Sequence, residues 1–196
     1  MCRFLYPWSM EPTGNSIRLL HAADAALFRE IRLEALRSSP EAFGSTFEAE
    51  AAQPLSLFSE RLESGAIMFG AFRGSETGSE IVGIAGLRLN QSTKEAHKGL
   101  LVSMYVRPEA RNSGVGQHLV ETILEYARGR VELVQLSVVR ENQPALRLYS
   151  RLGFVEYGVE RNALKQDGRY FDEVLMAIDL KPEKQAGKAR GDAKSA

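Results

Sequence analysis

The sequence is poor in the residues that bind metals and form disulfides. It contains one cysteine, Cys2, and three histidines, His21, His97 and His118, among 196 residues. One thiol cannot form a disulfide within the chain, which excludes a disulfide-stapled scaffold. Because the histidines are scattered and no pair of cysteines accompanies them, we expect no metal site.

The chain also lacks long apolar runs and an excess of charge of either sign. No apolar run approaches the ~20 residues that span a bilayer, and the N-terminal residues lack the sustained apolar stretch and cleavage site of a signal peptide. Lysine plus arginine and aspartate plus glutamate each number 25, so no overall charge favours nucleic acid. We therefore expect a cytoplasmic protein with no membrane partner and no nucleic-acid partner.

The two ends of the chain differ in composition from its centre. Residues 1–15 contain proline and glycine without any periodicity, which predicts a flexible leader. Residues 182–196 are polar, rich in alanine and lysine and devoid of aromatic side chains, which predicts a disordered tail. Residues 16–181 show no internal repeat and no boundary, so we expect a single domain there.

Helical and strand patterns alternate along this domain. Asp24 can cap a helix in which Leu27, Ile31 and Ala35 recur every four residues. The apolar run at 100–106 predicts a strand buried on both faces. The remaining elements are expected as a strand at 17–20, a helix at 55–62, strands at 67–72, 80–89 and 133–139, helices at 115–127 and 143–152, and a hairpin of 154–165 with 169–180 about the turn Asp167-Gly168.

The most informative stretch is 106–116, VRPEARNSGVG, where a buried strand meets a turn that opens an amphipathic helix. The first turn of a helix has unpaired N–H groups and the positive end of the helix dipole. Gly114 and Gly116 let the backbone approach a phosphate without an intervening Cβ, and Arg111 adds a cation at the same place. The stretch therefore predicts an anion site.

Spacing separates this turn from other phosphate loops. A Walker loop needs lysine followed by serine or threonine after its last glycine, but Gln117 and His118 follow Gly116. A dinucleotide fingerprint needs glycines spaced G-x-G-x-x-G, and Leu119 stands where the third would be. A glycine-rich turn without a ligand is the alternative if this motif is taken alone.

A second motif follows on the next helix. Asn142, Ala145 and Tyr149 lead into an L-G-F run, in the pattern N-x-x-A-x-x-x-Y-x-x-L-G-F. Together with R-x-x-G-x-G behind V-x-P at 106–116, this pattern resembles the two halves of the CoA site in the GNAT N-acetyltransferases. The resemblance covers about residues 16–181 and extends to a bacterial subset of the family whose acceptors are largely unassigned.

The resemblance implies an α/β (α+β) fold, with a central, mixed but mostly antiparallel twisted sheet of about seven strands flanked by about four helices. It also implies transfer of acetyl from acetyl-CoA to an amine, on a small molecule or a protein N-terminus, by direct attack in a ternary complex. Acetyl-CoA would be a co-substrate, and no metal would take part. Nothing in the sequence identifies the amine.

The resemblance also assigns the CoA contacts. In relatives, a β-bulge splays the strand before the loop, and its backbone amides hold the pantetheine arm; these positions match 103–106, with Met104 and Val106 as the expected main-chain contacts. The pyrophosphate would lie on the N–H groups of 111–117. The residues implied to bind CoA are Met104, Tyr105, Val106, Arg111, Asn112, Ser113, Gly114, Val115, Gly116, Gln117, Asn142, Ala145 and Tyr149.

Tyr149 matches the general acid of the family. Attack of an amine on the thioester expels the CoA thiolate, whose conjugate thiol has a pKa of about 8.5 by analogy with cysteine, and a phenol can protonate it. Taken alone, Tyr149 is better explained as a core aromatic on a helical stripe. The resemblance favours the acid.

The general base is less clearly marked. Some relatives carry a glutamate on the strand six residues before Val106, where this chain has Leu100. His97, three residues earlier, is our candidate because an imidazole exchanges protons near neutral pH, with a surface histidine as the alternative. A chain of waters ending on a carboxylate or a backbone carbonyl is an equal alternative.

The resemblance places the acceptor beside the loop between the first two helices. Phe43 and Phe47 are its candidate aromatic residues, with a place in the core as their alternative. Glu48, Asp172 and Glu173 are candidates to attract a cationic amine. Asp172 and Glu173 are neighbours on an expected strand, so at most one of them faces a given pocket. Solvated surface carboxylates are the alternative for Asp172 and Glu173.

A non-catalytic module that binds acyl-CoA as a sensor, or pairs with another chain, is the rival hypothesis. The absence of an acidic base at Leu100 favours it, whereas Tyr149 argues against it, because a pure binder needs no phenol near the sulfur. Homodimers are common in the family, so a homodimer is a mild expectation.

Overall fold

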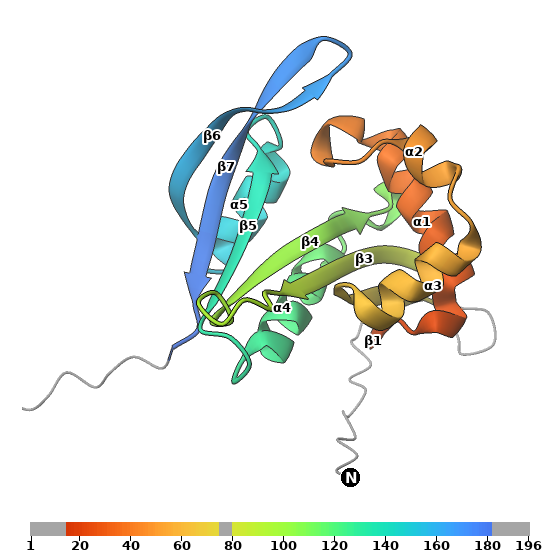
Figure 1. The fold of residues 1–196 in the computed structure, drawn as a ribbon, viewed down its shortest axis with the longest axis horizontal. Coiled ribbons are helices and arrows are strands. Elements are labelled where there is room, and N and C mark those ends of the chain that lie inside the picture. The colour runs from red at the N-terminus through yellow and green to blue at the C-terminus, as the bar shows by residue number, and fades with distance from the viewer. Residues whose placement is uncertain (1–14, 75–79, 182–196) are drawn as a thin grey trace, which may run out of the picture.

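Seven strands form one sheet in the computed structural model, which describes residues 15–74 and 80–181. The strand order is β1-β2-β3-β4-β5-β7-β6 (Figure 1). Neighbouring strands pair antiparallel except β4 and β5, which pair in parallel. The strands are β1 (Asn15–Leu19), β2 (Ile67–Arg73), β3 (Glu80–Leu89), β4 (Lys98–Val106), β5 (Leu133–Val139), β6 (Val155–Gln166) and β7 (Arg169–Asp179).

Helices cover both faces of this sheet. The α-helices are α1 (Ala25–Ser38), α2 (Phe47–Ala51), α3 (Leu55–Ser64), α4 (Val115–Ala127) and α5 (Gln143–Arg151), and the short 3-10 helices are η1 (Ala22–Asp24), η2 (Pro40–Ala42) and η3 (Pro108–Ala110). On one face, Leu119 and Ile123 of α4 and Tyr149 of α5 belong to one apolar core. On the other face, Phe28 of α1 and Phe58 of α3 belong to a second core that includes residues of β2 and β3. The sheet therefore separates an α4–α5 face from an α1–α3 face.

The expected fold class is confirmed, with one helix more than the sequence indicated. The described residues contain five α-helices rather than about four. The addition is α2, a helix of 5 residues, whose first turn is capped by the Thr46 hydroxyl accepting the N–H of Ala49. So short a helix has no room for a repeating apolar stripe, the main sequence signal of a helix.

The two ends of the expected domain, 16 and 181, lie at or next to the first and last described residues. β1 begins at Asn15, one residue inside the expected leader. The rest of that leader and the expected tail lie outside the described residues. Among the residues that are described, no helix is both long enough and apolar enough to cross a membrane.

The closing hairpin forms at the expected turn. Asp167 has φ 49° and Gly168 has φ 80°. Positive φ at both central positions is typical of the two-residue turn whose twist matches that of the flanking strands. The tip of this β6–β7 hairpin projects beyond the other strands (Figure 1).

The expectation that 100–106 is buried on both faces is wrong. Leu101 and Tyr105 are buried, but Leu100, Val102 and Met104 of the same strand are only half-buried. The reason is that β4 pairs with β5 only at its start, over 98–100. An apolar run does not distinguish a strand covered on both faces from one that borders an open cavity.

A buried ion-pair cluster fastens α2 to α1 and α3. Arg32 Nη2 donates to Glu50 Oε1 at 2.8 Å, and Arg61 Nη1 donates to Glu50 Oε2 at 2.9 Å. Burial opposes ionisation of Glu50, but the hydrogen bonds and charge of Arg32, together with the charge of Arg61, outweigh it and hold the pKa of Glu50 below its ordinary value. Arg32 also stacks over Phe43, with its guanidinium carbon 4.8 Å from the ring centroid, so the cluster also supports the loop after α1.

We expect Glu50→Gln to lower the free energy of unfolding by about 3 kcal/mol at neutral pH, because Arg32 would stay buried without a counter-charge. Chemical denaturation measures the change. The stability contributed by ionised Glu50 is present above the ordinary glutamate pKa of 4.5 and is lost as the pH falls through the lower folded-state value. The difference between the two proteins should therefore shrink in acid, and an undiminished difference there would contradict the assignment.

Glu48→Gln is the matched control for this measurement. Glu48 lies on the same short helix and is exposed. Its replacement should change the free energy of unfolding by no more than about 0.5 kcal/mol.

Candidate active site

A cavity of about 430 Å³ opens where β4 and β5 separate. Residues 100–104 of β4 and 137–139 of β5 form its two long sides, and residues 42–45, after α1, form another wall. Its remaining lining consists of Arg32, Arg88, Asn142, Ala145, Tyr149 and Glu173. The cavity therefore collects residues from α1 and the loop after it, β3, β4, β5, α5 and its N-cap, and β7.

A β-bulge in β4 accompanies this separation. Ser103 and Met104 of β4 lie opposite a single residue of β3, Ala85. Ser103 has φ 55°, a left-handed conformation that is uncommon outside glycine. Because a bulge bends its strand and increases the local twist, β4 stays with β3 and turns away from β5. The bulge lies within the 103–106 segment where the sequence led us to expect one.

The separation leaves two strand edges without a sheet partner. Beyond Leu100 on β4 and Gln135 on β5, the two strands make no further pairing with each other in the described residues. Buried backbone N–H and C=O groups require hydrogen-bond partners, and a free strand edge can accept an extended ligand as an additional strand. The gap therefore suits a ligand whose extended chain carries amide groups.

The turn between β4 and α4 offers free donors to an anion. The backbone N–H groups of residues 112–117 donate to no acceptor in the described part of the chain. Left-handed backbone at Asn112, φ 59°, and at Gly114, φ 87°, makes the turn tight. Arg111 Nε donates to the carbonyl oxygen of Val106 at 3.0 Å, which holds the guanidinium against the start of the turn. These are the properties of an anion-binding helix N-terminus.

Asn142 links α5 to the cavity. Its Oδ1 accepts the N–H of Ala145 at 3.2 Å and so caps the first turn of α5. The donors of its amide group have no described acceptor, and the residue lines the cavity. The side chain is thus able to donate to a bound ligand while it holds the helix in place.

Tyr149 lies one helical turn beyond Ala145 and is the phenol of the cavity. Only 5% of the residue is exposed, and its ring packs edge-on against Phe154 with centroids 5.7 Å apart. Its hydroxyl makes no hydrogen bond with a described residue. Burial raises the pKa of Tyr149 above its ordinary value of 10.0, so the phenol keeps its proton at neutral pH.

Two of the predicted site residues lie outside the cavity because of their position along the chain. His97 is exposed in the turn before β4, where its carbonyl accepts the N–H groups of Glu132 and Leu133 and the two strands still run together. Glu48 is exposed on α2. Neither residue lines the cavity, so the structure does not bring either of them to Tyr149.

The side chain of Tyr105 points away from the cavity. It is buried in the core of the α1–α3 face, and its hydroxyl is 3.0 Å from Ser38 Oγ and 3.1 Å from Glu34 Oε1. Burial, together with the hydrogen bond and charge of Glu34, raises the pKa of Tyr105. A ligand in the cavity could meet only the backbone of this residue.

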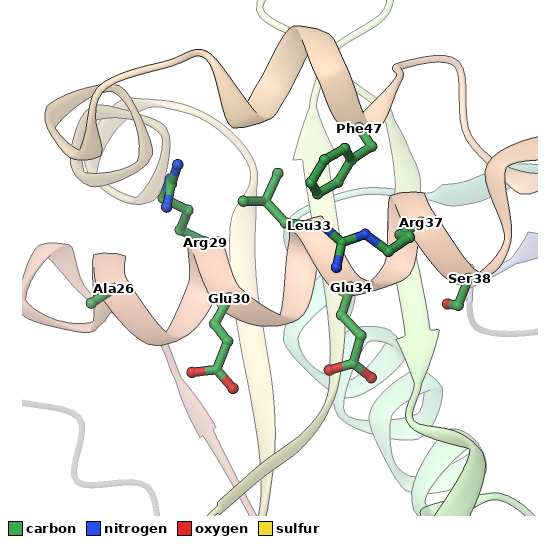
Figure 2. Close-up of a pocket in the computed structure, with 8 residues that line it drawn as sticks. All are labelled: Ala26, Arg29, Glu30, Leu33, Glu34, Arg37, Ser38 and Phe47. Atoms are coloured by element: carbon green, nitrogen blue, oxygen red, sulfur yellow. The ribbon is translucent and has the colours of Figure 1, made fainter.

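The two predicted aromatic residues occupy different places. Phe43 lines the cavity. Phe47 instead lies over Arg37, 4.1 Å from ring centroid to guanidinium carbon, in a wide groove of about 710 Å³ along α1 (Figure 2). Figure 2 shows Glu30 and Glu34 directed away from Phe47; both bind Arg107. This groove is larger than the cavity, but Glu30 and Glu34 are already paired with Arg107, and neither β4 nor β5 lines it.

Asp172 does not line the cavity, whereas its neighbour Glu173 does. Strand alternation puts Val174 in the core of the α4–α5 face, so Glu173 points to the opposite face and lines the cavity. The Asp172 carboxylate instead accepts the backbone N–H of Asn162 at 3.0 Å. The register of β7 with β5, which pairs Glu173 with Val139, decides which of the two acids enters the site.

Sequence reasoning missed two arginines of the cavity. Arg32 lies on α1, and Arg88 lies on β3 opposite Leu100. Arg88 is exposed, as a charged residue near the end of a strand ordinarily is, so only its place in an otherwise apolar run marked it in the sequence. No group of three or more His, Cys, Asp and Glu side chains suited to a metal ion occurs in residues 15–74 and 80–181.

Known sequences are similar to part of this chain. The model of the acetyltransferase (GNAT) family matches residues 28–154. The chain is 32% identical over 96 residues to N-alpha-acetyltransferase RimI of Mycobacterium tuberculosis, covering 48% of this chain and 58% of the relative. It is 31% identical over 85 residues to an L-methionine sulfoximine/L-methionine sulfone acetyltransferase of Pseudomonas aeruginosa, covering 43% and 49%. The chain thus spans about half the length of the curated relatives it matches.

Solved structures share the fold over most of the chain. A GNAT-family acetyltransferase from Streptococcus pneumoniae superposes with a TM-score of 0.74 at 23% identity, covering 85% of this chain and 99% of that one. YncA from Salmonella typhimurium, solved with acetyl-CoA, gives a TM-score of 0.69 at 22% identity, covering 89% and 98%. The family match includes the bulge, the anion-binding turn and Tyr149, and we conclude that the chain belongs to the acetyltransferase (GNAT) family.

Proposed function

We propose that the protein is an N-acetyltransferase that transfers acetyl from acetyl-CoA to an amine by direct attack in a ternary complex. The observation that carries this proposal is the separation of β4 from β5 beside the free N–H groups of 112–117. A gap between two strands suits the amide-containing arm of CoA, and free N–H groups at a helix N-terminus suit its pyrophosphate. Family membership and the YncA structure with acetyl-CoA support the same ligand.

The cofactor contacts follow from these two features. The pyrophosphate would accept hydrogen bonds from the N–H groups of 112–117, with Arg111 supplying a cation. The pantetheine arm would pair with the free backbone edge of β4 at Met104 and Val106. Asn142 would donate its amide group to the arm. The thioester would then lie in the cavity near Tyr149.

The chemistry needs one proton acceptor and one proton donor. An ammonium group must lose a proton before its nitrogen can attack the thioester carbonyl, and Glu173 is the carboxylate of the cavity that can accept it, directly or through water. The C–N bond forms, the tetrahedral adduct loses the second proton from nitrogen to solvent, and the C–S bond breaks. The departing sulfur takes the proton of Tyr149, which is afterwards protonated again. Glu173 thus takes the role for which His97 was our candidate.

A non-catalytic acyl-CoA sensor is less well supported by the same cavity. Such a module needs the anion-binding turn and the free strand edges, but it does not need an ionisable pair where the thioester would lie. Tyr149 presents a protonated hydroxyl without a described partner, and Glu173 lines the same cavity. A protonated phenol and a carboxylate in one cavity can serve proton transfer during acetyl transfer, whereas binding alone requires neither.

We also propose that the protein acts in the cytoplasm, where acetyl-CoA is available, and without nucleic acid. The proposal rests on the single cysteine and on the balance of 25 basic and 25 acidic residues.

The position of Gly116 provides a test of CoA binding. A Cβ at this residue would lie 3.4 Å from Met104 Cε and 3.5 Å from Leu148 Cδ2, between β4 and α5. These are ordinary contacts, so Gly116→Ala should fold with unchanged stability. Its methyl group would nevertheless narrow the gap next to the phosphate turn, and we expect the affinity for acetyl-CoA to fall about tenfold or more, measured by calorimetric titration.

Glu125→Ala is the matched control for this titration, because Glu125 is exposed in the last turn of α4, far from the anion-binding turn. Its affinity for acetyl-CoA should equal that of the wild type. A wild-type protein that binds no acetyl-CoA would refute the proposed function altogether.

Tyr149→Phe tests the proton donor. The missing hydroxyl has no described partner, so the melting temperature and acetyl-CoA affinity should not change, while kcat for thiol release should fall about 100-fold. Because burial raises the pKa of Tyr149 above 10.0, wild-type kcat should show no decline from loss of this proton below that pH. A decline below pH 10.0 that Tyr149→Phe abolishes would contradict the raised pKa, and an unchanged kcat would remove Tyr149 from the reaction.

Glu173→Gln tests the proton acceptor. We expect kcat/KM for the amine to fall about tenfold or more at neutral pH, with acetyl-CoA affinity unchanged. Raising the pH should restore part of the rate, because more of the amine is then already deprotonated. The control is Asp172→Asn, which alters the neighbouring carboxylate outside the cavity; equal losses in the two variants would argue against a specific role for Glu173.

A further inference from the structure

The charged groups of the cavity differ in whether they already have partners. Arg32 is held by the Glu50 carboxylate and stacks on Phe43. Arg88 and Glu173 also line the cavity, but neither forms a hydrogen bond or an ion pair with a described residue. The cavity therefore presents one cation and one anion that are free to bind a ligand.

Arg88 is badly placed to serve CoA. It is paired in register with Leu100, at the closed end of the gap, where β4 and β5 are still paired with each other. The anion-binding turn begins only after Val106, six residues further along β4, or ~20 Å at the usual rise of a strand. This distance is too great for an arginine side chain to span, so the charge of Arg88 is not needed for the pyrophosphate.

Arg88 and Glu173 lie on the same face of the sheet. Leu87 and Leu101 belong to the core of the α4–α5 face, and alternation along β3 turns Arg88 to the opposite face. Glu173 reaches that same face because its neighbour Val174 also belongs to the α4–α5 core. The two charges thus stand on the side of the sheet that is away from the anion-binding turn and α4, where an acceptor would approach the thioester.

One small ligand can meet both charges only if the two side chains extend toward each other. β3 and β7 are three strand spacings apart, or more than ~14 Å across the sheet. Along the strands the two residues are offset by the four residues from Gln135, opposite Leu100, to Val139, or ~13 Å. Arg88 lies at the closed end of the gap, at the level of Leu100, and Glu173 lies toward the open end, at the level of Val139.

The wall above these charges favours a small ligand over a peptide. The helix η2, which opens the loop after α1, contacts both β5 and β6 across the gap. Phe43 of this loop is fixed by Arg32, which is itself fixed by Glu50. The loop therefore bridges the cavity, whereas a peptide would need an open groove for the chain that follows its N-terminus.

We propose that the acceptor is an amino acid with a free carboxylate, which Arg88 binds while the amine lies toward Glu173. This inference rests on the proposed acetyl transfer and names its substrate class. A guanidinium recognises a carboxylate by two parallel hydrogen bonds, and a peptide N-terminus or a polyamine carries no carboxylate to meet it. Arg88 is thus the residue that determines specificity, and Glu173 serves both charge recognition and proton transfer.

The test compares matched acceptors with the wild type and Arg88→Gln. The probes are L-amino acids, the corresponding L-amino acid amides and the corresponding amines without a carboxyl group, with thiol release as the readout. We expect kcat/KM of the wild type to be about 10- to 100-fold higher for the best amino acid than for its amide. Arg88→Gln should remove that preference by raising KM for the acid, while its rate with the amide stays unchanged.

Two further variants separate recognition from a structural effect. Arg88→Lys keeps the charge but loses the paired hydrogen bonds, so it should restore part of the preference. Arg128→Gln removes an exposed arginine at the far end of α4 and should leave both substrates unchanged.

Three outcomes would overturn the assignment. Equal losses on acids and amides in Arg88→Gln would show a structural role for the arginine. A wild type that prefers amides, amines or peptide N-termini would refute the substrate class while leaving acetyl transfer intact. Absence of thiol release with every probe would refute the substrate class, and the acetyl-CoA titration would then show whether the proposed function fails as well.

Discussion

The separation of β4 from β5 is the feature on which the site depends. The two strands pair only at their first residues, and the bulge at Ser103 and Met104 keeps β4 with β3 instead. A sheet that stayed paired here would satisfy its own backbone and leave no space between the strands. The separation costs free energy, because backbone groups of β4 and β5 stay unpaired and Ser103 adopts a left-handed conformation. A protein retains such features when a bound ligand completes the missing hydrogen bonds.

Two ion-pair clusters hold the elements around this gap. Arg107, at the end of β4, is 8% exposed and binds Glu30 and Glu34 of α1 and Glu80 of β3. Burial opposes its charge, but the carboxylates of α1 outweigh that effect and raise the pKa of Arg107. The strand is thereby anchored to α1 and β3 just before the anion-binding turn. The cluster around Glu50 does the same for the loop that bridges the cavity, so both walls are attached to α1.

The charges that remain free are those that a substrate can use. Arg32 and Arg107, the buried arginines of the described residues, have carboxylate partners. Arg88, which is exposed, and Glu173, which is half-buried, line the cavity without partners among the described residues. Opposite charges on two walls orient a small zwitterion better than either could alone, because only one orientation satisfies both. The neutral phenol of Tyr149 adds a hydrogen-bond donor to the cavity without adding a charge.

The sequence by itself determined the features that depend on neighbouring residues. These include the amphipathic stripe of α4, the turn at Asp167-Gly168, the phosphate turn and the order of strands and helices, because helix periodicity and backbone preference are local properties. The tertiary structure decided what depends on pairing between distant segments. Register along β7 chose Glu173 over Asp172, the position of β4 left His97 outside the cavity, and the pairing of β3 with β4 brought Arg88 into it. No local pattern carries this information, because the same residues on a strand shifted by one position would face the other side of the sheet.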